Sequence, residues 1–106
     1  MTDEYKGRSL ALADEVQYAK GSVVSKTIFQ KKTGSLTLFA FDRGQSLSEH
    51  ISPYDATVMI LDGTAVLMIG REEIIAKTGE IVIMPANISH NVKASERFKM
   101  LLIMIR

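Results

Sequence analysis

The chain has no cysteine, no apolar run approaching the roughly 18 residues of a membrane span, and almost no net charge. The lack of cysteine excludes a disulfide framework, a thiolate ligand and a thiol nucleophile. Residues 1–10 are polar and lack the apolar stretch of a signal peptide. A net charge of +1 supplies no broad field for a phosphate backbone. We expect a cytoplasmic protein whose partners include neither nucleic acid nor membrane.

A single small domain accounts for the length and composition. The chain has 106 residues, 46% hydrophobic and 24% charged, which is ordinary for a globular protein and far from the composition of a disordered chain. That length suits one domain with a modest core. We therefore predict one domain over residues 1–106, with residues 1–10 forming a partly ordered N-terminal arm.

Short runs rich in Val, Ile, Leu, Thr and Phe alternate with glycine-containing turns, which is typical of an all-β protein. Strands are expected over residues 22–30, 35–42, 47–51, 57–61, 64–69, 72–76, 81–84, 88–92 and 98–105. Asp62-Gly63, Gly70-Arg71 and Thr78-Gly79 are predicted as three successive hairpin turns, which would make a meander. The one helical candidate, residues 11–16, is very short. This spacing of strands predicts a sandwich or closed barrel.

Three of the expected strands are apolar at every position: residues 66–69, 81–84 and 101–105. Such strands should be covered on both faces, unlike strands that alternate between a core and water. A second copy of the chain is the simplest cover, so we predict a homodimer. The alternative is that the N-terminal arm or long loops hide the outer faces.

Two histidines stand in similar frames of glycine and proline. Gly44 is followed by five residues and then His50, and the same frame continues through Ser52 and Ala56 to Gly63. This spacing resembles the first motif of the cupin superfamily, in which two histidines, a glutamate and a glycine follow the leading glycine. Ser52 occupies the place of the second histidine, and Ala56 occupies the place of the glutamate.

The second frame begins at Gly79 and continues through Pro85 to His90. It resembles the second cupin motif at these three positions. Asn87 stands where glycine is usual, and Ala94 stands where asparagine is usual. The two frames together cover residues 44–94. The resemblance implies an all-β fold of the cupin type, a double-stranded β-helix or jelly-roll barrel.

In typical cupins three histidines and one glutamate hold a divalent metal, so the resemblance implies that His50 and His90 are the two metal ligands kept here. Residues two apart on a strand share a face, so Ser52 would lie beside His50. Two histidines alone bind metal weakly; Asp55, Glu49, Asn87 and Asn91 are candidates for a third ligand. The ion would be iron, nickel, zinc or copper. Alternatively, both histidines line a pocket as hydrogen-bonding groups.

Further pocket residues are expected close to these frames. Ser52, Tyr54, Asp55 and Asn87 are the candidates; an exposed loop is the competing interpretation for Tyr54 and for Asp55. The methionines of the expected strands are interpreted as filling irregular core space, or as lining an adaptable cavity.

Three functions are compatible with these residues. The first is non-catalytic binding of a small polar or aromatic molecule in the barrel. The second is a metal-dependent enzyme, an oxygenase, isomerase or decarboxylase, in which the metal polarises a carbonyl or activates water. The third is a sensor or interaction subunit. The missing ligand residues favour the first.

Overall fold

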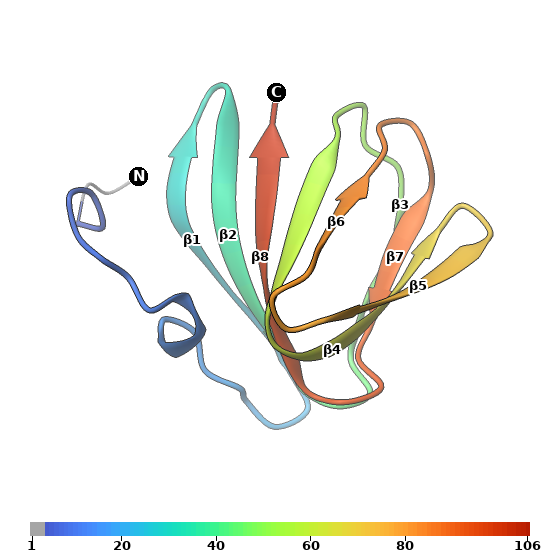
Figure 1. Cartoon of the computed structure of the whole chain (residues 1–106), viewed down its shortest axis with the longest axis horizontal. Helices are drawn as coiled ribbons and strands as arrows, with labels where there is room; N and C mark the ends of the chain where they lie inside the picture. The colour runs from blue at the N-terminus through green and yellow to red at the C-terminus, as the bar shows by residue number, and fades with distance from the viewer. Residues whose placement is uncertain (1–3) are drawn as a thin grey trace.

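The computed structural model describes residues 4–106 of the chain, in which the strands curl into an open barrel (Figure 1). Its elements are η1 (Leu12–Asp14), a 3₁₀ turn, and β1 (Val23–Lys31), β2 (Gly34–Phe41), β3 (Ser46–His50), β4 (Ala56–Ile69), β5 (Glu72–Lys77), β6 (Ile81–Met84), β7 (His90–Lys93) and β8 (Phe98–Ile105). The all-β fold predicted from the sequence is confirmed, and η1 replaces the helical candidate at residues 11–16.

Two antiparallel sheets form the walls. In the first sheet the strand order is β1-β2-β8-β4-β6, and in the second it is β5-β4-β7-β3. The long strand β4 belongs to both: its N-terminal half pairs with β8 and β6, and its C-terminal half pairs with β5 and β7. Figure 1 shows β4 bending at the base of the barrel, where the two sheets meet.

The prediction of a hairpin turn at Asp62-Gly63 was wrong, because both residues lie within the continuous strand β4. Gly63 does have a positive φ of 79°. It uses that conformation where β4 passes between sheets, next to a shift in the ladder with β8. A Cβ at Gly63 would overlap the carbonyl oxygen of Arg97. Glycine is therefore needed for a bend and a close backbone approach, and not for a turn.

The prediction of a meander was also wrong, because β5 and β6 do not pair with each other. Gly70-Arg71 does close a two-residue hairpin, since Ile69 pairs with Glu72. Thr78-Gly79 does not: β5 pairs with one half of β4 and β6 pairs with the other, so this turn carries the chain from the second sheet to the first.

The main core lies between the two sheets. Inward-facing residues of both walls are fully buried there, and the rings of Phe41 and Phe98 stack with their centroids 4.5 Å apart. Burying one such side chain contributes roughly 1.5–3 kcal/mol. Towards the wider end of the barrel, the same inward faces leave a cavity between them.

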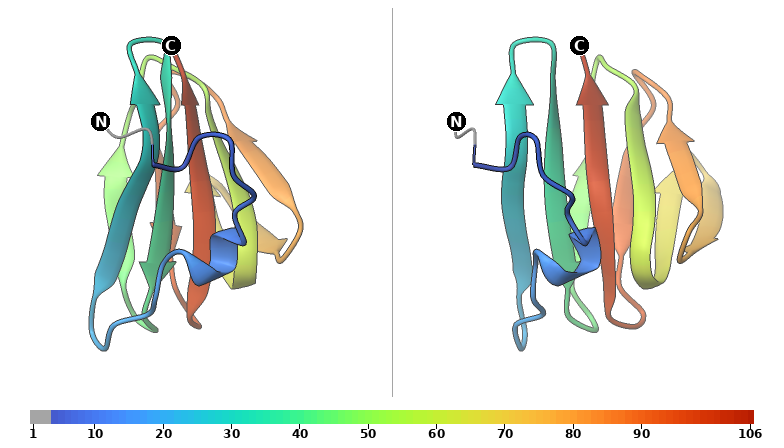
Figure 2. Two further views of the ribbon diagram at one scale, coloured as in Figure 1. Left: turned by 90° about the vertical axis from the view of Figure 1, so that its left-hand side faces the viewer. Right: turned by 60° about the vertical axis from the view of Figure 1, so that its left-hand side comes forward.

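The N-terminal segment packs on the outer face of the first sheet. Figure 2 shows it crossing β1 and β2 and placing η1 in front of β8. Leu10, Leu12 and Val16 join a second apolar cluster with Leu38 and Leu101. The N-terminal segment therefore covers Leu101 on the outer face of β8, as the alternative to a homodimer predicted for part of this face. Of the predicted arm, residues 1–3 lie outside the described part of the chain.

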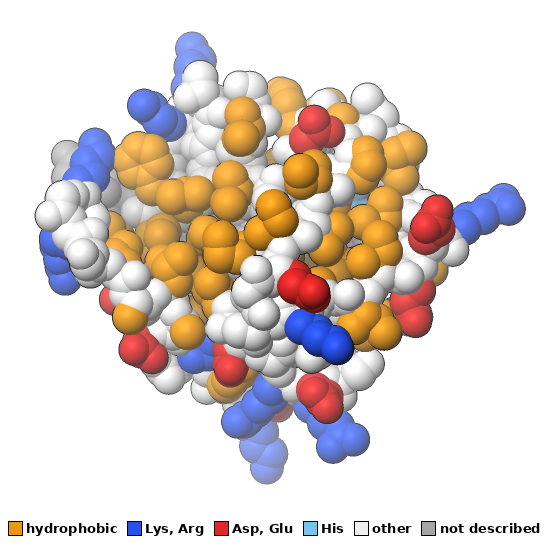
Figure 3. All heavy atoms as spheres, in the orientation of Figure 1, with side chains coloured by type: hydrophobic (Ala, Val, Ile, Leu, Met, Phe, Trp, Pro, Cys, Tyr) orange, Lys and Arg blue, Asp and Glu red, His pale blue; other side chains and the backbone are white. Residues whose placement is uncertain are grey.

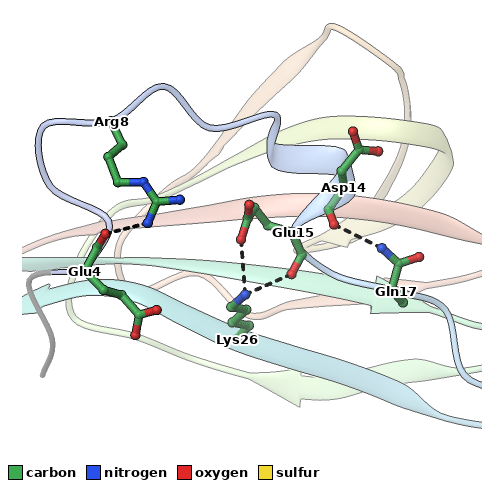
Figure 4. A network of polar contacts seen from close by, with 6 residues as sticks. All are labelled: Glu4, Arg8, Asp14, Glu15, Gln17 and Lys26. Carbon is green, nitrogen blue, oxygen red and sulfur yellow. Dashed lines mark hydrogen bonds and ion pairs between the residues drawn. The ribbon is translucent and has the colours of Figure 1, made fainter.

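Polar contacts also hold this segment in place (Figure 4). Lys26 of β1 donates to the backbone oxygen and to Oε1 of Glu15, each at 3.2 Å. Further along, the buried Lys99 of β8 donates to the carbonyl of Ala13. The segment is thus anchored to two strands of the first sheet.

Part of the outer face of the first sheet is left uncovered. Ile81 and Ile83 of β6 are 55% and 60% exposed, and Ile105 of β8 is 69% exposed. Hydrophobic side chains are grouped over the middle of the face seen in Figure 3, whereas charged side chains lie mainly around its margin. Two of the three all-apolar strands therefore keep isoleucines in contact with water in a single chain.

Candidate functional site

The side chains of His50 and His90 meet across two neighbouring strands. His50 ends β3, His90 begins β7, and the two residues are direct partners in the ladder. Their Nε2 atoms are 2.9 Å apart, and the rings lie edge to face at 76°. Two residues 40 positions apart in the sequence are thus brought into contact by strand pairing.

Backbone carbonyls determine which ring nitrogens carry hydrogen. Nδ1 of His50 lies 2.8 Å from the carbonyl oxygen of Ser48, and Nδ1 of His90 lies 3.1 Å from that of Ile88. A carbonyl only accepts, so both Nδ1 atoms are donors. In the neutral rings, both Nε2 atoms then carry lone pairs that face each other. This close contact is favourable only when a proton or another cation lies between the two nitrogens.

Burial disfavours a positive charge on the ring of His90. His90 is 2% exposed, and its pKa is lowered, first by burial and second by positive charge on His50; the hydrogen bond to Ile88 opposes this only partly. His50 is the more exposed of the two.

The histidine pair forms one wall of a cavity of about 210 Å³. The cavity is lined by Leu47, His50, Ser52, Ala56, Met84, His90, Val92, Met100, Leu102 and Met104. Seven of these ten residues are apolar, and the three polar ones come from β3, its following loop and β7. Polar groups thus approach an otherwise apolar space from one side, the second sheet.

The four positions that correspond to cupin metal ligands all line this cavity: His50, Ser52, Ala56 and His90. The two motifs thus bring these four positions to one space. Ser52 accepts a hydrogen bond on Oγ from the backbone N–H of Tyr54, at 3.1 Å. Its own hydroxyl hydrogen is still available for a molecule in the cavity.

Three predicted pocket residues do not line the cavity: Tyr54, Asp55 and Asn87. Tyr54 is exposed in the loop after β3. Asp55 accepts a hydrogen bond from the backbone N–H of Ala86 at 2.7 Å, and Asn87 donates its own backbone N–H to the carbonyl of Ser52 at 2.7 Å. Asp55 and Asn87 thus tie the β3–β4 loop to the β6–β7 loop and shape the cavity from outside.

The other candidates for a third ligand, Glu49 and Asn91, also lie away from the cavity. Glu49 accepts a hydrogen bond from the hydroxyl of Ser89. Asn91 follows His90 on β7, so its side chain leaves the opposite face of the sheet, where its Oδ1 is buried without a hydrogen-bond partner. Within residues 4–106, no three His, Cys, Asp or Glu side chains gather as a metal site.

The donors at this site therefore do not match those of a typical cupin. Ser52 and Ala56 replace one imidazole and the carboxylate, and no acidic residue lines the cavity in the part of the chain described. Catalytic zinc and non-haem iron sites commonly hold a divalent ion with histidines and a carboxylate. This cavity offers the histidines but not the carboxylate.

Sequence reasoning placed the methionines in core or cavity without assigning them to the site. Met84 on β6 and Met104 on β8 are the direct ladder partners of Ala56 on β4, one on each side. Directly opposed residues of a sheet share a face, so both methionines flank the position of the missing glutamate. The signal that identifies them is strand register, which cannot be obtained from the spacing of residues along one strand.

The fold and the position of this site define a double-stranded β-helix barrel with a cavity between its sheets. Residues 37–105 match the family model of the cupin domain. The chain belongs to the cupin family. No curated protein matches it at a significant level. Within residues 4–106, no helix has the length and apolar character needed to cross a bilayer.

Several solved structures are similar to this chain. A conserved protein of unknown function from Streptococcus pyogenes is 36% identical, with a TM-score of 0.89, over 94% of this chain and 88% of that one. A cupin superfamily protein from Desulfitobacterium hafniense is 30% identical, with a TM-score of 0.88, over 94% and 92%. A cupin 2 conserved barrel domain protein from Leptotrichia buccalis is 41% identical, with a TM-score of 0.86, over 90% of this chain but only 46% of that one.

Proposed function

We propose that this cupin is a binding protein for a small, mainly apolar molecule with one hydrogen-bonding group. The observation that carries the proposal is the cavity itself, with seven apolar lining residues and its polar groups on one side. Ligand sites are typically apolar pockets with a few polar groups that set orientation. His50, His90 and Ser52 would contact the polar group, and the methionines would adapt to the remainder of the ligand.

The cavity volume limits the ligand to a small metabolite. An apolar cavity of about 150 Å³ is large enough to bind benzene. The cavity of about 210 Å³ in this chain therefore has room for a single ring with a substituent or for a short branched chain. Phenol and cyclohexanol are suitable probes, because each combines one hydroxyl with an apolar body of this size.

The test is to measure the binding of each probe to the metal-free protein by ligand-detected NMR and by isothermal titration calorimetry. We expect at least one probe to bind with a Kd below about 1 mM, or about −4 kcal/mol. Ala56→Leu fills the cavity without changing either histidine and should weaken binding at least tenfold. Absence of binding by both probes, or equal binding by Ala56→Leu, would contradict the proposal.

Thr57→Leu is the matched control. Thr57 is the next residue of β4, and successive residues of a strand point to opposite faces, so its side chain lies outside the barrel. The change adds a comparable apolar volume to the same strand. Probe binding should be unchanged in Thr57→Leu, which separates filling of the cavity from a general effect on β4.

We also propose that two copies of the chain associate through the uncovered outer face of the first sheet. Strand register continues this surface from the exposed Ile83 of β6 through its successive ladder partners Thr57, Ile103 and Leu36 on β4, β8 and β2, of which Ile103 and Leu36 are half-buried beside the second apolar cluster. Exposed apolar patches of this kind are typical of interaction sites, and a two-fold axis lets one patch cover its own copy.

Light scattering after size-exclusion chromatography tests the association. The expected mass is twice the 11.7 kDa of the chain, and Ile83→Lys should return the protein to a monomer. Ile75→Lys, at an exposed isoleucine of β5 in the second sheet, is the control and should leave the dimer intact. A monomer at micromolar concentration for the unchanged protein would overturn the proposal.

A further inference from the structure

The cavity contains a set of uncharged donors that converge from both sheets. The second sheet supplies the two Nε2 atoms, 2.9 Å apart, whose lone pairs face each other because both Nδ1 atoms are hydrogen-bonded to carbonyls. A lone-pair contact of this kind is a site for a cation.

The first sheet supplies thioether sulfur. Met84 and Met104 flank Ala56 in the ladder, and both line the cavity together with the two histidines. The cavity lining thus combines imidazole and thioether side chains, and among residues 4–106 it includes no Asp, Glu or Cys.

The charge of the cation follows from this donor set. Because no acidic side chain neutralises it, the ion carries its full charge into a mainly apolar cavity. The solvation cost of burying an ion rises with the square of its charge, so a divalent ion costs about four times as much as a monovalent one of the same size. The site therefore favours a monovalent cation.

The identity of the cation follows from the softness of the ligands. Thioether ligands select Cu(I), whereas Mg²⁺, Ca²⁺ and Mn²⁺ prefer carboxylates, carbonyls and water. We propose that the cavity is a Cu(I) site, with Nε2 of His50 and His90 and the thioether sulfur of Met84 or Met104 as donors. This proposal goes beyond small-molecule binding and does not rest on it.

The geometry requires only a small adjustment. A tetrahedral ion 2.0–2.1 Å from each of two imidazole nitrogens holds those nitrogens about 3.3 Å apart. The present separation is 2.9 Å, so the rings must move apart by about 0.4 Å. His50 is exposed at the end of β3, next to a register shift in the β3–β7 ladder, and has room for this movement.

The experiment is an anaerobic titration of the full, untagged chain with Cu(I), in competition with a chromophoric Cu(I) chelator. X-ray absorption of the loaded protein then identifies the ligand atoms. We expect one Cu(I) per chain with both nitrogen and sulfur neighbours, and no displacement by a hundredfold excess of Zn²⁺. No binding at one equivalent, or displacement by that excess of Zn²⁺, would overturn the proposal.

The double variant Met84→Leu/Met104→Leu tests the sulfur ligands. Leucine preserves the volume and apolar character, so the fold should be kept, as circular dichroism can verify. Cu(I) affinity should fall at least tenfold, and the sulfur signal should disappear. Met59→Leu, at a β4 residue in the outer apolar cluster, should change neither. Unchanged affinity in the double variant would overturn the assignment of the thioethers.

The variant His50→Gln tests the imidazole ligands. It removes one Cu(I) donor but preserves a polar side chain and the cavity volume. Cu(I) affinity should fall at least tenfold in His50→Gln, and circular dichroism should show that the fold is kept. If His50→Gln binds Cu(I) as tightly as the unchanged chain, the imidazole pair is not the site.

Discussion

The hydroxyl of Tyr18 lies 2.6 Å from Oδ2 of Asp62, so the N-terminal segment is hydrogen-bonded to the residue where β4 begins to leave the first sheet. Burial, together with this hydrogen bond and the charge of Asp62, raises the pKa of Tyr18. The side chains of Arg97 and Lys99 also lie against this ring, at 5.0 and 4.9 Å from its centroid.

Tyr18→Phe should lower the free energy of unfolding by about 1–3 kcal/mol, the range for a hydrogen bond to a charged group. The ring and its contacts with Arg97 and Lys99 are kept, so the loss reports the hydrogen bond. Urea denaturation at pH 7 is the measurement. Tyr54→Phe, at an exposed loop tyrosine, is the control and should change stability by less than about 0.5 kcal/mol.

Gly63→Ala should destabilise the barrel by more than about 3 kcal/mol, because the added Cβ overlaps the Arg97 carbonyl in addition to the cost of a positive φ. Gly44→Ala is a matched control: its φ is also positive, at 86°, but no atom lies within 4 Å of the added Cβ. It should cost only about 1–2 kcal/mol. Equal losses for the two variants in chemical denaturation would contradict the close approach of β4 to the residues before β8.

Asp42 should make the fold sensitive to acid. The pKa of its carboxyl is lowered to about 2, first by the backbone N–H of Gly21 and then by the side chain of Arg97. Since the unfolded carboxyl titrates near 3.9, the stabilisation is present above that pH and is lost as the pH falls towards 2.

Asp42→Asn should therefore reduce stability at pH 7 and flatten its decline between about pH 5 and 2. Urea midpoints measured across this range provide the comparison. Glu72→Gln removes one negative charge from an exposed residue of β5 and serves as the control. A decline in Asp42→Asn as steep as that of the unchanged protein would show that other carboxyls dominate.

Restoring the two absent cupin ligands should create a divalent metal site. In Ser52→His/Ala56→Glu, three imidazoles and a carboxylate would line the cavity, since positions 50, 52, 56 and 90 all do so now. Elemental analysis after incubation with Ni²⁺ or Zn²⁺ should find about one ion per chain, against much less in the unchanged protein. Ser52→His/Thr57→Glu, with the carboxylate on the outer face of β4, should bind the ion less tightly than Ser52→His/Ala56→Glu, because it supplies three imidazoles but no carboxylate.

The histidine frames and the strand pattern were sufficient to predict the barrel and the register of four cavity positions. Glycine spacing and period-two alternation are local properties, and they place His50 and Ser52 on one face. The contribution of Met84 and Met104 could not be predicted in this way. Their place beside Ala56 depends on pairing between strands that are far apart in the chain.

The failure at Asp62-Gly63 has a different physical cause. A type I′ turn and a strand bend both require a residue that tolerates positive φ, so the dipeptide alone cannot distinguish them. The close approach to Arg97, 34 positions later, decides for the bend. Asp55 and Asn87 lie outside the cavity lining because they tie two loops together, and Tyr54 is exposed in the loop after β3.

The sharing of β4 between both sheets has a consequence for how the chain folds. Its partners β5 and β6 are near in the sequence, but β8 is more distant and is the only link to β2 and β1 within residues 4–106. The first sheet cannot be completed until this last strand is added, so little of that wall should be stable on a partly synthesised chain. Such non-local pairing gives a high contact order, and we expect folding in milliseconds to seconds as one cooperative transition.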